Sequence, residues 1–406
     1  MKILICGAGC AGTALAFWLA RAGHHVTVIE RSQSLRALGA QIDIRNQGIE
    51  VIKRMGLLDA VRNKLVKEEG THMVNSAGEV KAVFGTGNFS ATAEYEIMRG
   101  DLVTLVYEAT KNHENIKYIF GKSVESFDER ENETGNENDI LVHFSDGSTD
   151  SFDLLVGADG QGSRIRSSIL PPGSKEYRKL GIYAAYWFIP RIETDTNTMS
   201  MYSSPGGRLI LRRSHNATET QVYCIFRDDE NTAQLNKLMR APAEEQKSYW
   251  KKKFHDAGWE ADRFLAGIDN TANFYCHEVV QVTAENWVRG RVALIGDAAH
   301  CPSPLTGLGT TTSLIGAYVL AGEITKSPND LVLALKNYET VLRPLIREVQ
   351  VVGPMKIKMA FPQSQWAINL KLAVMGFLCW LGIPDLLSQY VTDTSEWQLP
   401  HYPALE

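Results

Sequence analysis

The feature that most restricts the fold is a glycine-rich turn close to the start of the chain. Residues 2–6 form a short apolar run that predicts a buried strand, and residues 14–22 have the pattern of a helix. Between them lies Gly7-x-Gly-x-x-Gly12, and a second apolar run ends in Glu30. A strand, such a turn, a helix and a strand ending in an acid make up the dinucleotide-binding βαβ unit of the Rossmann fold.

The same turn predicts how an adenine dinucleotide is held. Gly7, Gly9 and Gly12, with Ala11 in the same turn, permit the tight bend and let the backbone approach a pyrophosphate at the helix N-terminus. Glu30, followed by Arg31, can bind both ribose hydroxyls and disfavours a 2′-phosphate. FAD or NAD is therefore expected here rather than NADP. The alternative is a glycine-rich turn that binds nothing.

A second informative stretch covers residues 291–309. An apolar strand, residues 292–295, ends in Gly296-Asp297, and two prolines and two glycines force an irregular loop before a helix begins near Leu308. Loop and helix amides can stabilise negative charge, and Asp297 can accept hydrogen bonds from hydroxyl groups. This stretch predicts a second part of a nucleotide-type site.

Other charged residues lie at similar junctions. A strand ending at residue 156 leads into Gly157-Ala-Asp159-Gly160, and Arg99 stands between a strand and a helix that Gly100 or Asp101 is expected to cap. Asp43 and Arg36 could serve phosphates or hydroxyls, and for Arg45 a ligand role and a surface charge are equally good interpretations.

From about residue 177 the chain changes to long, aromatic-rich strands that predict an inserted antiparallel sheet. We expect a mixed α/β fold with a Rossmann-like FAD-binding domain and a substrate domain. Most aromatic side chains of the insert should be core, and some could line a pocket for a flat ligand. The expected bounds are 1–70, 99–176 and 283–355 for the FAD-binding domain, 71–98 and 177–282 for the substrate domain, and 356–406 for a C-terminal helical segment packed on both.

Composition removes several classes of function. The 406 residues carry a net charge of −5, which gives no electrostatic case for nucleic acid. Six scattered cysteines and the lack of a signal peptide predict a reduced, cytoplasmic location. Residues 366–387 are apolar, but their charge-free run is too short for a membrane span. We expect a helix packed against the domains there, with membrane contact as the alternative.

Together the motifs at residues 7–12, 159–160 and 296–300 resemble those of the single-component FAD-dependent aromatic hydroxylases. This is the family with the p-hydroxybenzoate hydroxylase fold, and the pattern is most similar to its tetracycline-inactivating monooxygenases. The resemblance covers nearly the whole chain. It implies non-covalent FAD, reduction by NAD(P)H, addition of O2 at the flavin C4a position, and oxygen transfer from the hydroperoxide to an apolar, ring-containing small molecule.

The resemblance also assigns roles to residues. Arg36 would lie near the nicotinamide donor, Asp43 near FAD, and Arg99 on the nucleotide chain of the flavin. Asp159 would serve both FAD and NAD(P)H, and Asp297 would hold a ribityl hydroxyl. The stretch from Pro304 to Thr311, which includes Gly307, Gly309 and Thr310, would bracket the isoalloxazine. The family often has Asn where Thr311 stands. The resemblance names no catalytic side chain, because the flavin carries the chemistry.

Two alternatives stay open at this stage. One is a flavin oxidase or dehydrogenase that inserts no oxygen, and the other is an FAD-bearing binding protein without turnover. His277 and His300 are acid–base candidates by position only, and structural roles suit them better. Cys301 suggests a covalent flavin link, but a small structural residue is the better interpretation.

Overall fold

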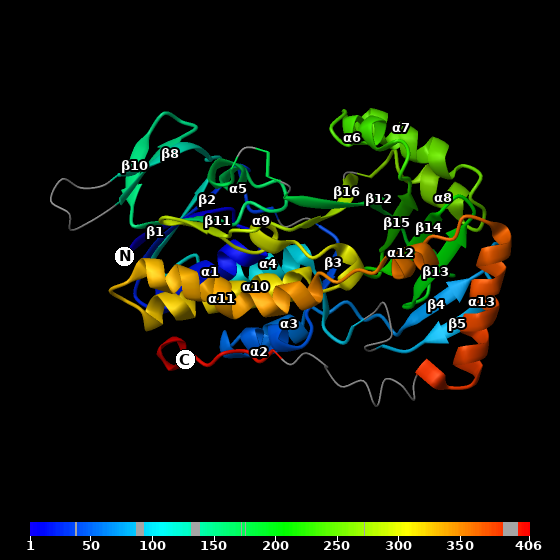
Figure 1. Cartoon of the computed structure of the whole chain (residues 1–406). Coiled ribbons are helices and arrows are strands. Elements are labelled where there is room, and N and C mark those ends of the chain that lie inside the picture. The colour runs from blue at the N-terminus through cyan, green and yellow to red at the C-terminus, as the bar shows by residue number, and fades with distance from the viewer. Residues whose placement is uncertain are drawn as a thin grey trace.

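The computed structural model describes residues 1–36, 39–86, 93–130, 139–171, 173–174, 176–271, 273–384 and 397–406. Within these residues the chain builds two large sheets that lie at opposite ends of an elongated molecule (Figure 1). The first sheet has the order β17-β18-β11-β1-β2-β7 and is parallel apart from the β17–β18 pair. Its strands are Lys2–Cys6 (β1), His25–Glu30 (β2), Ile116–Phe120 (β7), Leu154–Gly157 (β11), Val288–Arg289 (β17) and Val292–Leu294 (β18).

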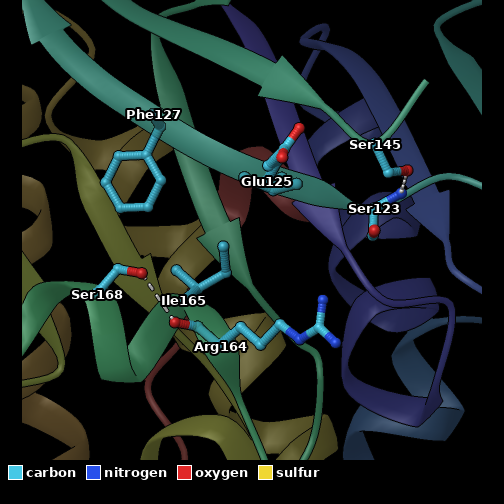
Figure 2. Close-up of a pocket in the computed structure, with 8 residues that line it drawn as sticks. Ser123, Glu125, Phe127, Ser145, Arg164, Ile165 and Ser168 are labelled. Atoms are coloured by element: carbon cyan, nitrogen blue, oxygen red, sulfur yellow. Dashed lines mark hydrogen bonds between the residues drawn. The ribbon is translucent and has the colours of Figure 1, made fainter. Parts of the chain in front are cut away.

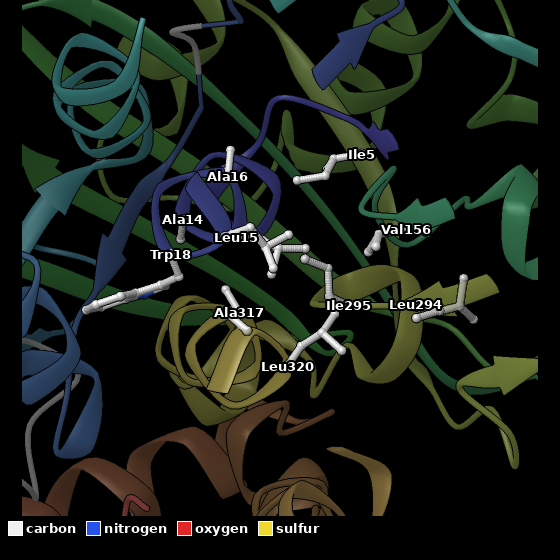
Figure 3. Packing of buried hydrophobic residues seen from close by; sticks show 14 of the residues in the cluster. Ile5, Ala14, Leu15, Ala16, Trp18, Val156, Leu294, Ile295, Ala317 and Leu320 are labelled. Atoms are coloured by element: carbon white, nitrogen blue, oxygen red, sulfur yellow. The ribbon is translucent and has the colours of Figure 1, made fainter. Parts of the chain in front are cut away.

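Helices cover this parallel sheet and complete its core. Leu15 and Trp18 of α1 pack with Ile5 of the sheet and with Ile295 and Leu320 (Figure 3). These side chains are fully buried, as expected for a parallel sheet covered by helices. The helices here are Cys10–Arg21 (α1), Gln47–Arg54 (α2), Leu58–Arg62 (α3), Arg99–Thr110 (α4), Arg164–Ile169 (α5), Asp297–His300 (α9), Gly309–Lys326 (α10) and Leu331–Val349 (α11).

The second sheet joins two distant parts of the chain. Its order is β16-β12-β15-β14-β13-β4-β5, antiparallel except where β4 runs parallel to β13. Helices Thr232–Leu238 (α6), Ala243–Phe254 (α7) and Ala261–Ala266 (α8) lie beside it (Figure 1). Its strands are Thr71–Val74 (β4), Val80–Phe84 (β5), Tyr177–Pro190 (β12), Met199–Ser204 (β13), Arg208–Ser214 (β14), Glu219–Arg227 (β15) and Tyr275–Val282 (β16).

Strand β12 places aromatic side chains on both faces of the second sheet. Side chains alternate along a strand, so Tyr183 and Trp187 enter the core beneath the helices. Tyr186 lies between them in the sequence and points to the other face, where it meets Tyr223 and Tyr275. The aromatic residues of the insert are therefore divided between the core and a surface that faces the rest of the molecule.

Smaller elements complete the fold. Strands Gln41–Asp43 (β3) and Glu96–Met98 (β6) pair with each other, and Val124–Arg130 (β8), Asp139–Phe144 (β9) and Thr149–Phe152 (β10) form a hairpin sheet. Helix Gln365–Trp380 (α13) follows the short helix Pro354–Ala360 (α12) and packs on β5. The terminal residues return to α10, where the Tyr402 hydroxyl donates to Glu323 at 2.7 Å.

Two expected helix starts need correction. Helix α4 begins at Arg99 with Met98 at its N-cap, so neither Gly100 nor Asp101 caps it. The sequence also predicts a helix that starts at Ser327-Pro328; helix α11 begins instead at Leu331, because the Asp330 side chain accepts from the amide of Leu333. The polar stretch from Glu129 to Asp139 predicts a mobile loop, but it falls mainly on residues 131–138, which lie outside the described residues. Residues 385–387, the end of the 366–387 segment, also lie outside them.

Candidate active site

Three sequence motifs that are far apart in the chain touch each other at the carboxyl ends of the parallel strands. A Cβ built on Gly7 would lie 2.5 Å from the carbonyl oxygen of Ala158 in the second motif. A Cβ built on Gly296 would lie 2.7 Å from Cβ of Ala11. Gly7 and Gly296 also have φ values of 114° and 57°, which favour glycine. The motifs thus form one continuous backbone surface, with Ala11 at its centre.

The glycine-rich turn has one position that is open to a ligand. A Cβ on Gly12 would lie 1.9 Å from the Gly7 carbonyl oxygen, so Gly12 is needed for the turn itself. A Cβ on Gly9 meets only Nη2 of Arg99, at 3.6 Å. Gly9 is the N-cap of α1 and has no side-chain cap. Space, first-turn amides and the positive end of a helix therefore coincide at Gly9, the combination that binds a pyrophosphate.

Glu30 stands at the end of β2, beside this turn. Its two carboxylate oxygens accept from the amides of Ala8 at 3.1 Å and Ser32 at 3.0 Å. These bonds fix the carboxylate next to the turn while each oxygen keeps further acceptor capacity. This is the placement that ribose recognition requires. Arg31, the next residue, is exposed.

Arg99 supplies positive charge above the glycine turn. Its guanidinium interacts with Cys10, Asp297 and Tyr186, so it lies between α1, the third motif and the second sheet. It stays exposed to solvent in spite of these neighbours. A cation in this position can meet a phosphate group bound at Gly9.

Asp297 begins α9 and faces the start of α10. A Cβ built on Gly309 would lie 4.0 Å from Oδ1 of Asp297, so the carboxylate lies beside the N-terminus of an 18-residue helix. Burial raises the pKa of Asp297, whereas Cys301 and Arg99 act in the opposite direction. Burial also raises the pKa of Cys301 well above its ordinary value, and a protonated thiol makes a covalent flavin link unfavourable.

The loop before α10 is held in a strained geometry. Ser303 has a φ of 87°, which is rare for a residue other than glycine. Its side chain accepts from the amide of Leu305 and starts the short 3-10 helix Pro304–Thr306 (η1). Gly307 follows with a φ of 66°. Pro304 is exposed, and Gly309 and Thr310 are partly exposed, so this loop can contact a ligand.

The strand β3 and the next loop lie against this segment. A Cβ on Gly307 would lie 3.1 Å from Oδ2 of Asp43, and the same oxygen accepts from Arg45 Nη2 at 2.8 Å. Thr311, where the family often has Asn, accepts from the Arg45 amide at 2.9 Å. Burial and the neighbouring Glu96 raise the pKa of Asp43 to about 6. The charge of Arg45 is thus used inside the site rather than on the surface.

A buried arginine joins the second motif to the third. Arg166 donates to the carbonyl oxygens of Ala298 at 2.9 Å and Gln161 at 2.6 Å, and it pairs with Glu176. Asp159 accepts from the amide of Arg164 at 2.8 Å and so fixes the start of α5. Its other oxygen is buried and has no partner within the described residues. Asp159 therefore fixes the start of α5 with one carboxylate oxygen, and its other oxygen can accept a hydrogen bond from a ligand.

An aromatic surface faces these motifs from the second sheet. The ring centroid of Tyr186 lies 5.6 Å from that of Tyr223 and 5.5 Å from that of Tyr275. Arg36 and Arg99 both lie close enough to influence the pKa of Tyr186, which burial raises to about 12. Our sequence analysis missed Tyr223 and Tyr275. Their alternation within β15 and β16 was the available signal, but it does not say which face meets the site.

A buried ionic network lies next to the aromatic surface. Arg213 pairs with Glu68 and Glu96, each at 2.6 Å. Gln41 donates to Glu96 at 2.7 Å and accepts from Gln221 at 3.0 Å, which joins β3 to the second sheet. This network could not be predicted from local sequence patterns, because its five members come from five separate segments.

Two surface pockets differ in their relation to this arrangement. The pocket in Figure 2, of about 270 Å³, lies between β8 and α5 and is lined by residues such as Glu125, Phe127 and Arg164, with no residue of the glycine turn among them. A second pocket, of about 350 Å³, is lined by Gln161, Lys179, Arg240, Tyr275 and His277 among others. It therefore joins the end of the second motif to the aromatic surface.

Comparison with known proteins agrees with this geometry. The sequence profile of the FAD binding domain family matches residues 1–330. The chain belongs to this FAD-binding family. It is 36% identical to the FAD-dependent monooxygenase asL6 of Sarocladium schorii, over all of this chain and 99% of that protein. It is 34% identical to monooxygenase CTB7 of Cercospora beticola, over 99% and 97% of the two chains.

Solved structures give the same result for the fold. The crystal structure of tetracycline destructase Tet(51) is 29% identical and superposes with a TM-score of 0.78 over 99% of both chains. Klebsiella pneumoniae HpxO in complex with FAD, 19% identical with a TM-score of 0.73 over 96% and 98%, shares the fold. The expected α/β fold, the FAD cofactor and the flavin monooxygenase class are therefore confirmed.

The residues present fit FAD in this family. The open Gly9, the fixed Glu30 carboxylate, the exposed Arg99 and the Asp297 carboxylate all lie at one end of the parallel sheet. Other candidates do not reach this surface. His300 is buried beside Trp287, its ring 4.9 Å away, and is therefore structural. Among the described residues no cluster of side chains could hold a metal ion.

Asp297→Ala is expected to weaken FAD binding while the fold survives. A charge-assisted hydrogen bond is worth about 1.5–3 kcal/mol, which corresponds to a roughly ten- to hundredfold loss of affinity. Fluorescence titration of the apoprotein with FAD measures this, and Asp297→Asn, which keeps an acceptor, serves as the matched control. An unchanged dissociation constant for the alanine variant would show that Asp297 does not contact the flavin.

Proposed function

We propose that this monooxygenase uses NAD(P)H and O2 to insert oxygen into an apolar, ring-containing small molecule. The observation that carries the proposal is the aromatic surface of Tyr186, Tyr223 and Tyr275, which lies opposite the three FAD motifs and next to Arg99. Flat rings pack well on such a surface. The tetracycline destructases, which this chain resembles over nearly its full length, are named for a polycyclic substrate.

The assignment of residues to FAD is also part of the proposal. The N-terminus of α1 at Gly9 holds the pyrophosphate together with Arg99, Glu30 holds the ribose, and Asp297 holds a ribityl hydroxyl. The strained loop from Pro304 to Thr310 then borders the isoalloxazine, with Asp43 behind Gly307. Bound FAD supplies the redox chemistry and the activation of O2. In domain terms, residues 1–70, 99–176 and 283–355 hold the cofactor.

The protein side chains orient the reactants and limit water. The Arg213 network fixes β3 against the second sheet, so Asp43 and the aromatic surface keep a constant separation. Arg36 is exposed and lies near Tyr186 and Tyr275, where a cation can meet the anionic NAD(P)H. The pocket with Gln161 and Arg240 adjoins Tyr275, and Arg240 offers further positive charge for its phosphates, whereas Lys179 in the same pocket is paired with Glu278 at 3.0 Å.

The test is substrate-dependent consumption of NAD(P)H. Because the aromatic surface and the nicotinamide approach meet at Arg36, substrate binding should favour the arrangement in which the flavin is reduced. We expect slow oxidation with peroxide release without substrate, and faster oxidation with oxygen from ¹⁸O2 in the product when substrate is present. A product without ¹⁸O would indicate an oxidase or dehydrogenase. Bound FAD with no turnover across a substrate panel would indicate a binding protein.

Arg36→Ala is expected to raise the NAD(P)H concentration needed for half-maximal rate by roughly tenfold, while FAD content stays normal. The reason is the loss of one charge-assisted contact to the dinucleotide. Stopped-flow flavin reduction at several NAD(P)H concentrations measures the effect, with Arg347→Ala, at an exposed arginine of α11 outside the site, as a control. Equal reduction rates for the Arg36 variant and the native protein would remove Arg36 from the NAD(P)H site.

A further inference from the structure

The solvent side of α13 is largely apolar, and its exposed polar residues are Gln365 and Asn369 in the first turns. Five of its large apolar side chains, and that of Leu381 at its C-cap, are exposed by between 47% and 79%, which is the reverse of an ordinary surface helix. Their spacing of three and four residues places them on one face. We call this face the α13 stripe, and it consists of Trp366, Leu370, Val374, Phe377, Trp380 and Leu381.

The opposite side of α13 fastens the helix to the second sheet. Ile368 is buried, Lys371 reaches Ser203 Oγ at 3.5 Å, and a Cβ on Gly376 would lie 2.5 Å from the carbonyl oxygen of Lys81. The helix runs along the outer edge of the molecule beside β5 (Figure 1). The contacts of this face of α13 are with β5 and β13 of the second sheet. The other face is presented outward on a rigid support.

Along the sequence, the segment that contains α12 and α13 has charges of one sign, and the acid that precedes β5, Glu79, is paired with Lys81 at 2.8 Å. Between Glu348 and Asp385 the sequence contains three lysines and no acidic residue, although the whole chain has a net charge of −5. Lys371 faces the sheet, but Lys356 and Lys358 of α12 are exposed, together with Met355 and Met359. This part of the surface is therefore both apolar and positive.

We infer that the α13 stripe binds the surface of an anionic phospholipid bilayer, with α13 lying parallel to the membrane. Trp366 and Trp380 stand at the two ends of the stripe, and tryptophan favours the boundary between headgroups and acyl chains. Lys356 and Lys358 supply the attraction to acidic lipid headgroups. No helix among the described residues is long and apolar enough to cross a membrane, which leaves the in-plane arrangement.

The size of the stripe favours lipid over a second copy of the chain. A strip one helix wide, about 10 Å, and about 22 Å long covers roughly 220 Å². A stable dimer buries about 800 Å² on each partner. A single amphipathic helix, by contrast, is sufficient for reversible binding to a bilayer.

Flotation of the holoenzyme with lipid vesicles tests this inference. We expect the protein to float with vesicles of phosphatidylcholine and phosphatidylserine, and less with phosphatidylcholine alone. Trp366→Ser combined with Trp380→Ser should weaken the binding at least about tenfold. Lys356→Gln with Lys358→Gln should weaken binding roughly thirtyfold, on the acidic vesicles only. Val332→Ser with Leu333→Ser, an exposed apolar pair on α11, should change nothing.

Three results would overturn the inference. The first is native protein that stays away from acidic vesicles. The second is a dimer in lipid-free sedimentation that the double tryptophan variant dissociates, which would assign the stripe to contact between copies. The third is acrylamide quenching, without lipid, that is the same in the native and double tryptophan proteins, which would mean that another part of the chain covers the stripe. Thermal melting of each variant verifies that it is folded.

Discussion

Gly9→Val protein is expected to fold with nearly native stability and to contain no FAD. The backbone at Gly9 has φ −83° and ψ −172°, an extended conformation that valine adopts readily. Within the protein the new Cβ would meet only the flexible end of Arg99, at 3.6 Å. The added methyl groups would instead occupy the space in which a pyrophosphate approaches the helix amides, so the loss should be confined to the cofactor.

Gly12→Val is the matched control with the opposite outcome. Its Cβ would lie 1.9 Å from the Gly7 carbonyl oxygen, a backbone atom that cannot move without breaking the turn. We expect this variant to be insoluble or destabilised by several kcal/mol, in the range of severe overpacking (about 3 kcal/mol or more). The measurements are the flavin absorbance of each purified protein and its thermal midpoint. A yellow Gly9→Val protein would move the pyrophosphate away from this turn.

The second large effect concerns acid stability. His300 is 1% exposed, and neither of its ring nitrogens has a hydrogen-bond partner among the described residues. Burial lowers the pKa of His300 to about 3. Between pH 6.5, the ordinary pKa of histidine, and pH 3, the unfolded chain binds a proton at this site that the folded chain does not bind. Stability is therefore lost as the pH falls through this window, by about 3 kcal/mol between pH 7 and pH 4.

His300→Leu should remove this part of the pH dependence. Leucine fills a similar volume without unpaired nitrogens, so at pH 7 the variant should be at least as stable as the native protein. Urea unfolding followed by tryptophan fluorescence at a series of pH values measures the slope. His255→Leu, a change at an exposed histidine, should leave the slope unchanged. If the His300 variant kept the native slope, the acid sensitivity would come from other groups. The next candidate would be His277, because burial lowers its pKa to about 4.

The sequence was informative where local chemistry is strong. The glycine turn, the acid of Glu30 and the Gly296-Asp297 stretch each have a spacing that few structures tolerate, and the structure brings all three together. Helix starts were less predictable, because Met98 and Asp330 compete with equally plausible caps nearby. The Arg213 network and the face chosen by Tyr275 depend on contacts between distant segments, which local patterns do not encode.

The order of strands in the first sheet has a consequence for how the chain is made. Strand β1 pairs with β11 through Ile3 and Leu154, and β11 pairs with β18 through Leu155 and Val292. A ribosome must therefore release most of the chain before the cofactor surface can close, and such non-local pairing is slow. Until then the early β1–β2 segment exposes apolar strands. Cellular FAD, which can bind only the completed surface, should thus raise the yield of folded protein during synthesis.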